Sequence, residues 1–212
     1  LIIIYGIVQI LLAIYGYDYI HKIELIFSIL LGIMFLYITI TGNFVNLNYN
    51  GNTNMYYFGI VLATSFAYIA SWAPYGSDYS RYLPRNTSSR KIFIYSFLGS
   101  FLSTIWLEIL GFLVAIKTGN TNSMLAAYSL SGFLGILTVI SLFMGGLGTN
   151  AVNIYSHSLS INSIFKNFDR KKLLIISGFI GIILAIIGFQ SFYTFYEDFL
   201  YFLDYWIMPW FG

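Results

Sequence analysis

A long apolar run that breaks near its C-terminal end constrains this chain more than any other feature. From Tyr56 to Trp72 the sequence has no charged residue and is long enough to enter the hydrocarbon core of a bilayer. Pro74, which lacks a backbone donor, and Gly76 then interrupt the run. Lipid cannot satisfy the backbone groups that such a break frees, so it must face protein or a water-filled cavity. Interrupted helices form binding sites in secondary transporters, and we therefore expect a transport protein with a helix broken at about 72–77.

Composition places the chain in the all-α transmembrane class. It is 58% hydrophobic and 8% charged, whereas soluble domains contain about 25% charged residues. The sequence has no cysteine, and His157 has no second histidine nearby, so we predict neither a disulfide nor a metal site. A net charge of +2 without a basic run argues against nucleic-acid binding. No hydrolase signature, phosphate loop or dinucleotide fingerprint occurs, so an enzyme is not expected.

Hydropathy predicts about seven membrane-crossing segments within a single transmembrane domain over 1–212. The chain begins and stops inside apolar sequence, and we expect it to be an internal piece of a longer membrane protein. The segments lie at roughly 1–17, 25–42, 56–82, 91–116, 131–160, 173–189 and 195–212.

The basic residues fall on alternate connections between these segments. Nine of the ten Lys and Arg residues lie on one side, and Lys117 is the exception. The positive-inside rule makes that side cytoplasmic. It predicts a multi-pass protein of the cell membrane with cytoplasmic loops at 18–24, 81–91 and 166–172.

A polar stripe is predicted on the segment 131–160. Asn150 and Asn153 are three residues apart, with Ser156 or His157 next, so they share one helical face. Such amides in hydrocarbon must face protein or water. Their paired donors and acceptors suit a planar heterocycle. They equally suit hydrogen bonds between helices, with the neighbouring glycines allowing close approach. Both interpretations stay open.

Other polar and aromatic residues have two interpretations each. Trp72 is either an aromatic platform for a flat ligand or an interfacial residue. Asp78 and Arg81, three residues apart, are predicted to form an ion pair or gate latch near the cytoplasmic end. Glu108, deep in an apolar segment, either carries a coupling proton or is a neutral carboxyl bonded to a neighbour.

Four ordered motifs resemble one family. The stretch Ser71–Pro84 resembles the signature of nucleobase:cation symporters of the purine/cytosine permease type. Three further stretches resemble its helices four, eight and ten: Ala13–Tyr17, Asn153–Ser156 and Tyr205–Trp210. The resemblance covers nearly the whole chain and implies helices four to ten of a twelve-helix protein with two inverted five-helix repeats.

The resemblance also implies a substrate. It suggests a secondary active transporter that imports cytosine, a purine or a related planar heterocycle together with a cation. The helix-six contact falls to Ser71 and Trp72, and the helix-eight amides are Asn150 and Asn153. Allantoin or hydantoin-type solutes are alternatives, as is an uncoupled channel- or receptor-like protein on the same scaffold. The expected partners are this small molecule and the lipid bilayer, and no oligomeric state is predicted.

The coupling ion is inferred from a departure from the family pattern. Sodium-coupled relatives have small hydroxyl residues where this chain has Leu147 and Gly148, with Thr149 one place away. This weakens a sodium site and favours proton coupling, although backbone carbonyls leave Na⁺ open. The candidate cation-coupling residues are Glu108, Gly148 and Thr149, and no cofactor is expected.

Overall fold

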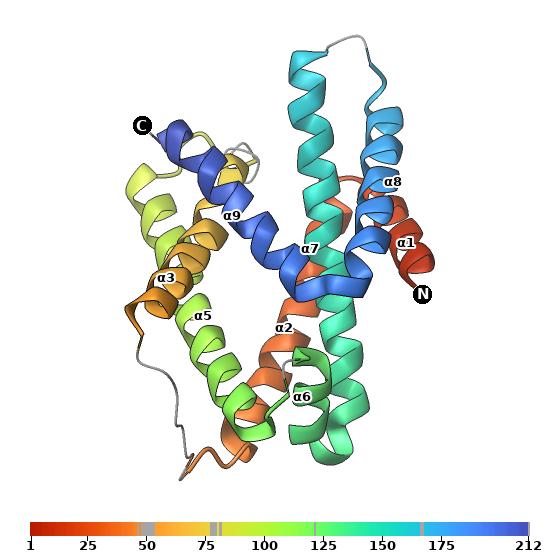
Figure 1. Ribbon diagram of the computed structural model, residues 1–212. Coiled ribbons are helices and arrows are strands. Elements are labelled where there is room, and N and C mark those ends of the chain that lie inside the picture. The colour runs from red at the N-terminus through yellow and green to blue at the C-terminus, as the bar shows by residue number, and fades with distance from the viewer. Residues whose placement is uncertain are drawn as a thin grey trace. The chain divides into compact units, whose positions relative to one another are not determined.

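Helices make up all the regular structure that the computed structural model describes, which covers residues 1–45, 47, 54–76, 80, 82–120, 122–165 and 168–211. This confirms the all-α class (Figure 1). The longer helices are α1 (Ile2–Tyr15), α2 (Tyr17–Thr41), α3 (Met55–Ala70), α5 (Ser89–Thr118), α6 (Ser123–Leu130), α7 (Gly135–Ile164), α8 (Arg170–Gly188) and α9 (Phe192–Phe211).

The chain packs into two compact units, and each is described by itself. The first unit comprises Leu1–Tyr49 and Thr104–Ile183. The second comprises Asn50–Ser103 and Leu184–Gly212. Helices α5 and α8 each contribute residues to both units.

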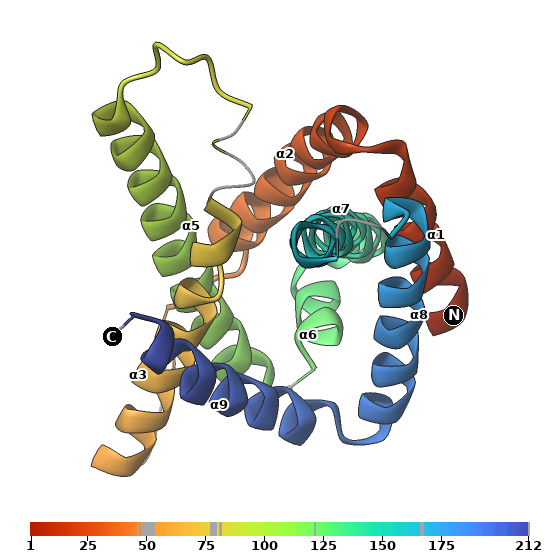
Figure 2. The same ribbon diagram turned by 90° about the horizontal axis from the view of Figure 1, so that it is seen from above.

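Helix α7 is the centre of the first unit. It packs against α1, α2 and α6, which surround it when the unit is seen from above (Figure 2). Helix α8 lies beside α1, where Gly6 faces Ile182 and Gly178 faces Ile10. A methyl group on either glycine would overlap the facing isoleucine. Small residues therefore set the spacing of these helices, as is common where helices pack in membranes.

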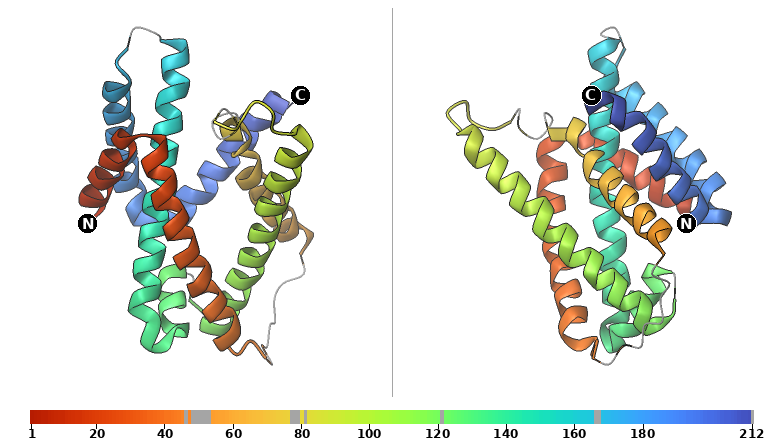
Figure 3. Two further views of the ribbon diagram at one scale, coloured as in Figure 1. Left: turned by 180° about the vertical axis from the view of Figure 1, so that it is seen from behind. Right: turned by 60° about the vertical axis from the view of Figure 1, so that its left-hand side comes forward.

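The glycine cluster of α7 has the same packing role. Gly145 lies against Leu31 of α2, and Gly146 lies against the hydroxyl of Tyr5 on α1. That hydroxyl donates a hydrogen bond to the carbonyl of Phe143, with an O–O distance of 2.8 Å. Figure 3 shows α2 running beside α7. Close helix approach is thus a function of these glycines.

Two buried hydroxyl groups in the first unit, those of Thr138 and Ser131, are paired. Thr138 Oγ1 donates to Ser131 Oγ at 2.8 Å, and both side chains are fully buried. Ser131 Oγ in turn donates to the carbonyl of Ala127 at 2.7 Å. Pairing removes the cost of placing these polar atoms in an apolar core and fixes α6 against the start of α7.

The connection between the first two helices is shorter than the sequence predicts. The expected loop at 18–24 is wrong, because these residues belong to α2, which begins at Tyr17; their cytoplasmic side stays a prediction. The break is Gly16 alone, whose φ of +94° suits glycine. Several of the residues after it are polar, but they include neither glycine nor proline, so nothing in them stops a helix.

Four of the described helices are long and apolar enough to cross a membrane. Helices α1 and α3 are apolar but shorter. The expectation of about seven crossings in one domain stays a prediction. The four candidate spans are Asp18–Thr41, Ser89–Thr118, Gly132–Ile164 and Arg170–Gly188.

In the second unit, α3 packs against α9, and the two lie side by side in Figure 3. Helix α3 starts at a conventional cap, since Asn54 Oδ1 accepts the backbone N–H of Tyr56 at 2.9 Å. It ends at Ala70, which brings the chain to the predicted interruption.

Candidate functional site

The interruption after α3 begins where the sequence predicts it. Ser71 caps the C-terminus of α3, and one turn of 3-10 helix follows at Ala73–Tyr75. Ser71 Oγ donates to the carbonyl of Tyr68 at 2.7 Å, so the hydroxyl stabilises the last turn of its own helix. Residues 77–79 lie outside the described part of the chain.

Trp72 brings aromatic surface to this interruption. Its half-buried ring lies 5.7 Å from the ring of Tyr75, with an angle of 53° between the planes. The Trp72 backbone is held on both sides, because its N–H donates to Ile69 and its carbonyl accepts from Tyr75. A fixed backbone limits where the indole can lie, which is a condition for a stacking platform.

The polar stripe of α7 follows one of the two predicted paths. Asn150 and His157 are exposed and Asn153 is half-buried, whereas Ser156 is only 3% exposed. The stripe therefore continues through His157, two turns beyond Asn150, and Ser156 turns into the helix contacts. The side chains of Ala151, Val152 and Tyr155 are buried as well.

The three candidate cation-coupling residues have different surroundings. Thr149 Oγ1 donates to the carbonyl of Gly145 in its own helix at 3.2 Å. Gly148 is buried against α2, where a Cβ on this glycine would lie 3.1 Å from Cγ of Glu24. Glu108 is an exposed side chain on α5. The carboxyl group beside Gly148 is therefore that of Glu24.

Sequence reasoning missed Glu24 because it placed the residue in the expected loop 18–24. The signal that would have placed Glu24 on a helix is the run from Tyr17 to Thr41, which contains no strong helix breaker apart from Gly32.

Asp78 and Arg81, the predicted gate pair, lie outside the described residues. Ser71 and Trp72 belong to the second unit, and Asn150 and Asn153 belong to the first.

A cavity of about 370 Å³ lies within the first unit, between α2, α5, α6 and α7. Its walls are largely apolar, and Asn120 and Ser123 supply polar groups. Its lining does not include Asn150 or Asn153. The lining residues are Phe35, Ile38, Leu107, Leu110, Gly111, Val114, Ala115, Asn120, Ser123, Ala126, Ala127 and Leu142. No cluster of three or more potential metal ligands occurs among the residues that the structure describes.

The long apolar helices and the interrupted helix define a class, that of multi-pass membrane proteins. Comparison with known families makes the assignment specific. The family described as permeases for cytosine/purines, uracil, thiamine and allantoin matches residues 1–212. The chain belongs to this family, which confirms the resemblance of its motifs, and the family consists of transporters rather than enzymes.

Three relatives illustrate the match. The putative purine-cytosine permease YxlA of Bacillus subtilis is 28% identical over 94% of this chain and 47% of its own length. The purine-cytosine permease fcyB of Emericella nidulans is 29% identical over 97% of the chain and 45% of its own. The vitamin B6 transporter TPN1 of Saccharomyces cerevisiae is 27% identical over 99% of the chain and 41% of its own. The chain thus spans about half the length of these relatives, and no solved structure matches it significantly.

Proposed function

We propose that the full-length protein imports a nucleobase, cytosine or a purine, across the cell membrane together with a proton. The family match over the whole chain supports this proposal, because the family consists of permeases for such heterocycles. Two of the relatives are named purine-cytosine permeases. The predicted orientation places loops 81–91 and 166–172 in the cytoplasm, so that import runs toward them.

The proposed substrate-binding residues are the four that the family resemblance implies, Ser71, Trp72, Asn150 and Asn153. Asn150 and Asn153 offer amide donors and acceptors along an accessible stripe of α7. Trp72 offers a ring on which a flat base stacks, worth about 1–3 kcal/mol. Ser71 holds the end of α3 and thereby positions Trp72. The proposed role of Asp78 and Arg81 is that of a gate.

Proton coupling is favoured over sodium coupling by the side chains of α7. Gly148 has no side-chain oxygen, and the Thr149 hydroxyl donates to its own helix. A sodium ion at these two positions would have one side-chain oxygen, that of Thr149, and would otherwise depend on backbone carbonyls, which the intact α7 helix already uses. Glu108 remains a candidate carrier of the coupling proton.

A second substrate class is favoured by one relative. The vitamin B6 transporter matches 99% of this chain, which extends the candidates to substituted pyridines. Allantoin and hydantoins stand beside them as non-aromatic ring amides. An uncoupled protein on the same scaffold would be recognised by uptake that follows the solute gradient alone.

Radiolabelled uptake by the full-length protein tests the function. We expect saturable uptake of cytosine or adenine that collapses with a proton ionophore. Trp72→Ala and Asn153→Ala should weaken apparent affinity about tenfold or more at equal membrane abundance, whereas Asn86→Ala, on an exposed loop, should not. Unchanged affinity in both site variants would contradict the assignment. Absence of uptake of either base would move the search to pyridines and allantoin.

A further inference from the structure

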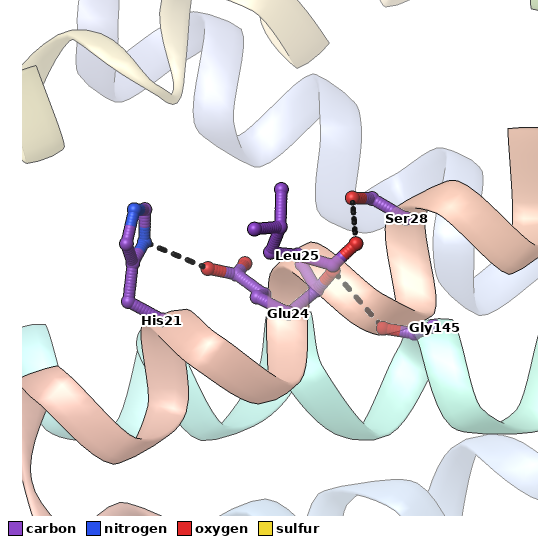
Figure 4. A network of polar contacts seen from close by, with 6 residues as sticks. His21, Glu24, Leu25, Ser28 and Gly145 are labelled. Atoms are coloured by element: carbon purple, nitrogen blue, oxygen red, sulfur yellow. Dashed lines mark hydrogen bonds and ion pairs between the residues drawn. The ribbon is translucent and has the colours of Figure 1, made fainter.

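We propose that Glu24 of α2 carries the coupling proton, an inference that rests on the proposed proton symport. Its carboxyl lies inside the candidate span Asp18–Thr41, six residues from the start of the span, or about 9 Å along the helix axis. The side chain is 25% exposed, so water can reach it while most of it packs against protein. Figure 4 shows it beside His21 on α2.

The contact with α7 connects Glu24 to the helix that carries the proposed substrate-binding asparagines. Since Gly148 has no side chain, Glu24 packs directly on the α7 backbone, and a Cβ at Gly148 would lie 3.1 Å from Glu24 Cγ and 3.7 Å from Glu24 Cα. Gly148 lies roughly opposite Asn150 on α7, because two residues turn a helix by about 200°. One helix therefore carries the proposed substrate stripe on one side and meets a carboxyl on the other.

The charges around Glu24 leave its ionised form weakly compensated. His21 Nδ1 is 3.9 Å from Glu24 Oε2, beyond hydrogen-bond distance, and the His21 side chain is 59% exposed. Asp18 and Lys22 lie on the same helix. Helices α1, α6 and α7, which pack against α2, contain no Asp, Glu, Lys or Arg in their sequences; their titratable residues are tyrosines and His157. Helix α5 contacts the C-terminal half of α2, where Trp106 donates to Thr39 and Lys117 to the carbonyls of Gly42 and Asn43; its other charged residues are Arg90, Lys91 and Glu108.

This environment suits a group that changes protonation during transport. An ionised carboxylate in a membrane span is stable only while water or a cation compensates it. Closing the α2–α7 contact excludes that water and favours the neutral acid, and opening it reverses the balance. The carboxylate takes one proton from one side and releases it to the other, so each neutral base moves with one positive charge.

Two transport modes of the full-length protein separate coupling from binding. Accumulation against a gradient, driven by an imposed pH difference, requires proton movement; exchange of labelled for unlabelled base at equal pH does not. Glu24→Gln should lower accumulation about tenfold or more while exchange stays within about twofold of wild type. Glu24→Asp should recover part of the accumulation. Asp169→Asn, a matched change at the exposed start of α8, should leave both unchanged.

The outcomes are distinct. Normal proton-driven accumulation in Glu24→Gln at equal membrane abundance would overturn the proposal, and a loss confined to Glu108→Gln would assign the proton to Glu108 instead. Loss of exchange together with accumulation in both Glu24 variants would make Glu24 a binding or structural residue and would also overturn it. Failure of the proposed function appears differently, as wild-type uptake that ignores the pH gradient.

Discussion

Lys117, in the last turn of α5, contacts the C-terminal end of α2 within the first unit. Replacing it tests how much this contact stabilises the protein. Its ammonium donates to the carbonyls of Gly42 and Asn43 at 2.6 Å each, just past the end of α2. The same group lies 5.9 Å from the centre of the Phe44 ring. A cation at a helix C-terminus interacts favourably with the unpaired carbonyls and the helix dipole.

The magnitude follows from these contacts. A hydrogen bond to a charged group contributes about 1.5–3 kcal/mol when buried. Lys117 is largely exposed, so solvent screening reduces the two bonds together to about 1–2 kcal/mol. Lys117→Met keeps the apolar stem and removes the cation. It should change the unfolding equilibrium by about 5–30-fold and lower the thermal midpoint by a few degrees.

The assay is thermal unfolding of the purified full-length protein in detergent, followed by the loss of its monodisperse chromatographic peak. Lys117→Arg should retain most of the midpoint, because guanidinium also donates to carbonyls. Lys91→Met, in the first turn of α5, should not lower it, since a cation there opposes the helix dipole. A Lys117→Met midpoint equal to wild type would refute this account of the α2–α5 connection.

Three further substitutions test local structure by the same thermal assay. Thr138→Val removes the buried hydrogen bond to Ser131 and should destabilise the protein by about 0.5–1.5 kcal/mol. Asn122→Ala removes the cap that accepts two backbone N–H groups at the start of α6, at a cost of about 1 kcal/mol. Tyr155→Leu removes the ring that lies 4.5 Å from the Arg170 guanidinium, with an expected loss of about 0.5–2 kcal/mol.

Two of these changes, at Thr138 and Tyr155, have a control within the chain. Thr64→Val removes a hydroxyl that bonds only to its own helix, at Ile60 and Val61, and should change the midpoint little. Tyr155→Phe keeps the aromatic face and should retain the cation–π contribution. A midpoint for Thr138→Val no lower than that for Thr64→Val would contradict the pairing of Thr138 with Ser131.

Local chemistry explains which site features were predictable. The break after Ala70 follows from Pro74 and Gly76, because both act on the backbone within a few residues of their own position. The choice between Ser156 and His157 was not predictable, since both are consistent with helical spacing after Asn153. Packing of α7 against its neighbours decided it by burying Ser156.

The sequence by itself determined the helical class, the family and the interrupted helix, because these depend on apolar runs and motifs read along the chain. Tertiary structure alone decided which residues meet across helices. Gly148 and Glu24 are 124 positions apart, and no local pattern links them. Their contact arises because α2 and α7 pack closely at small residues, a property of two surfaces together rather than of either helix.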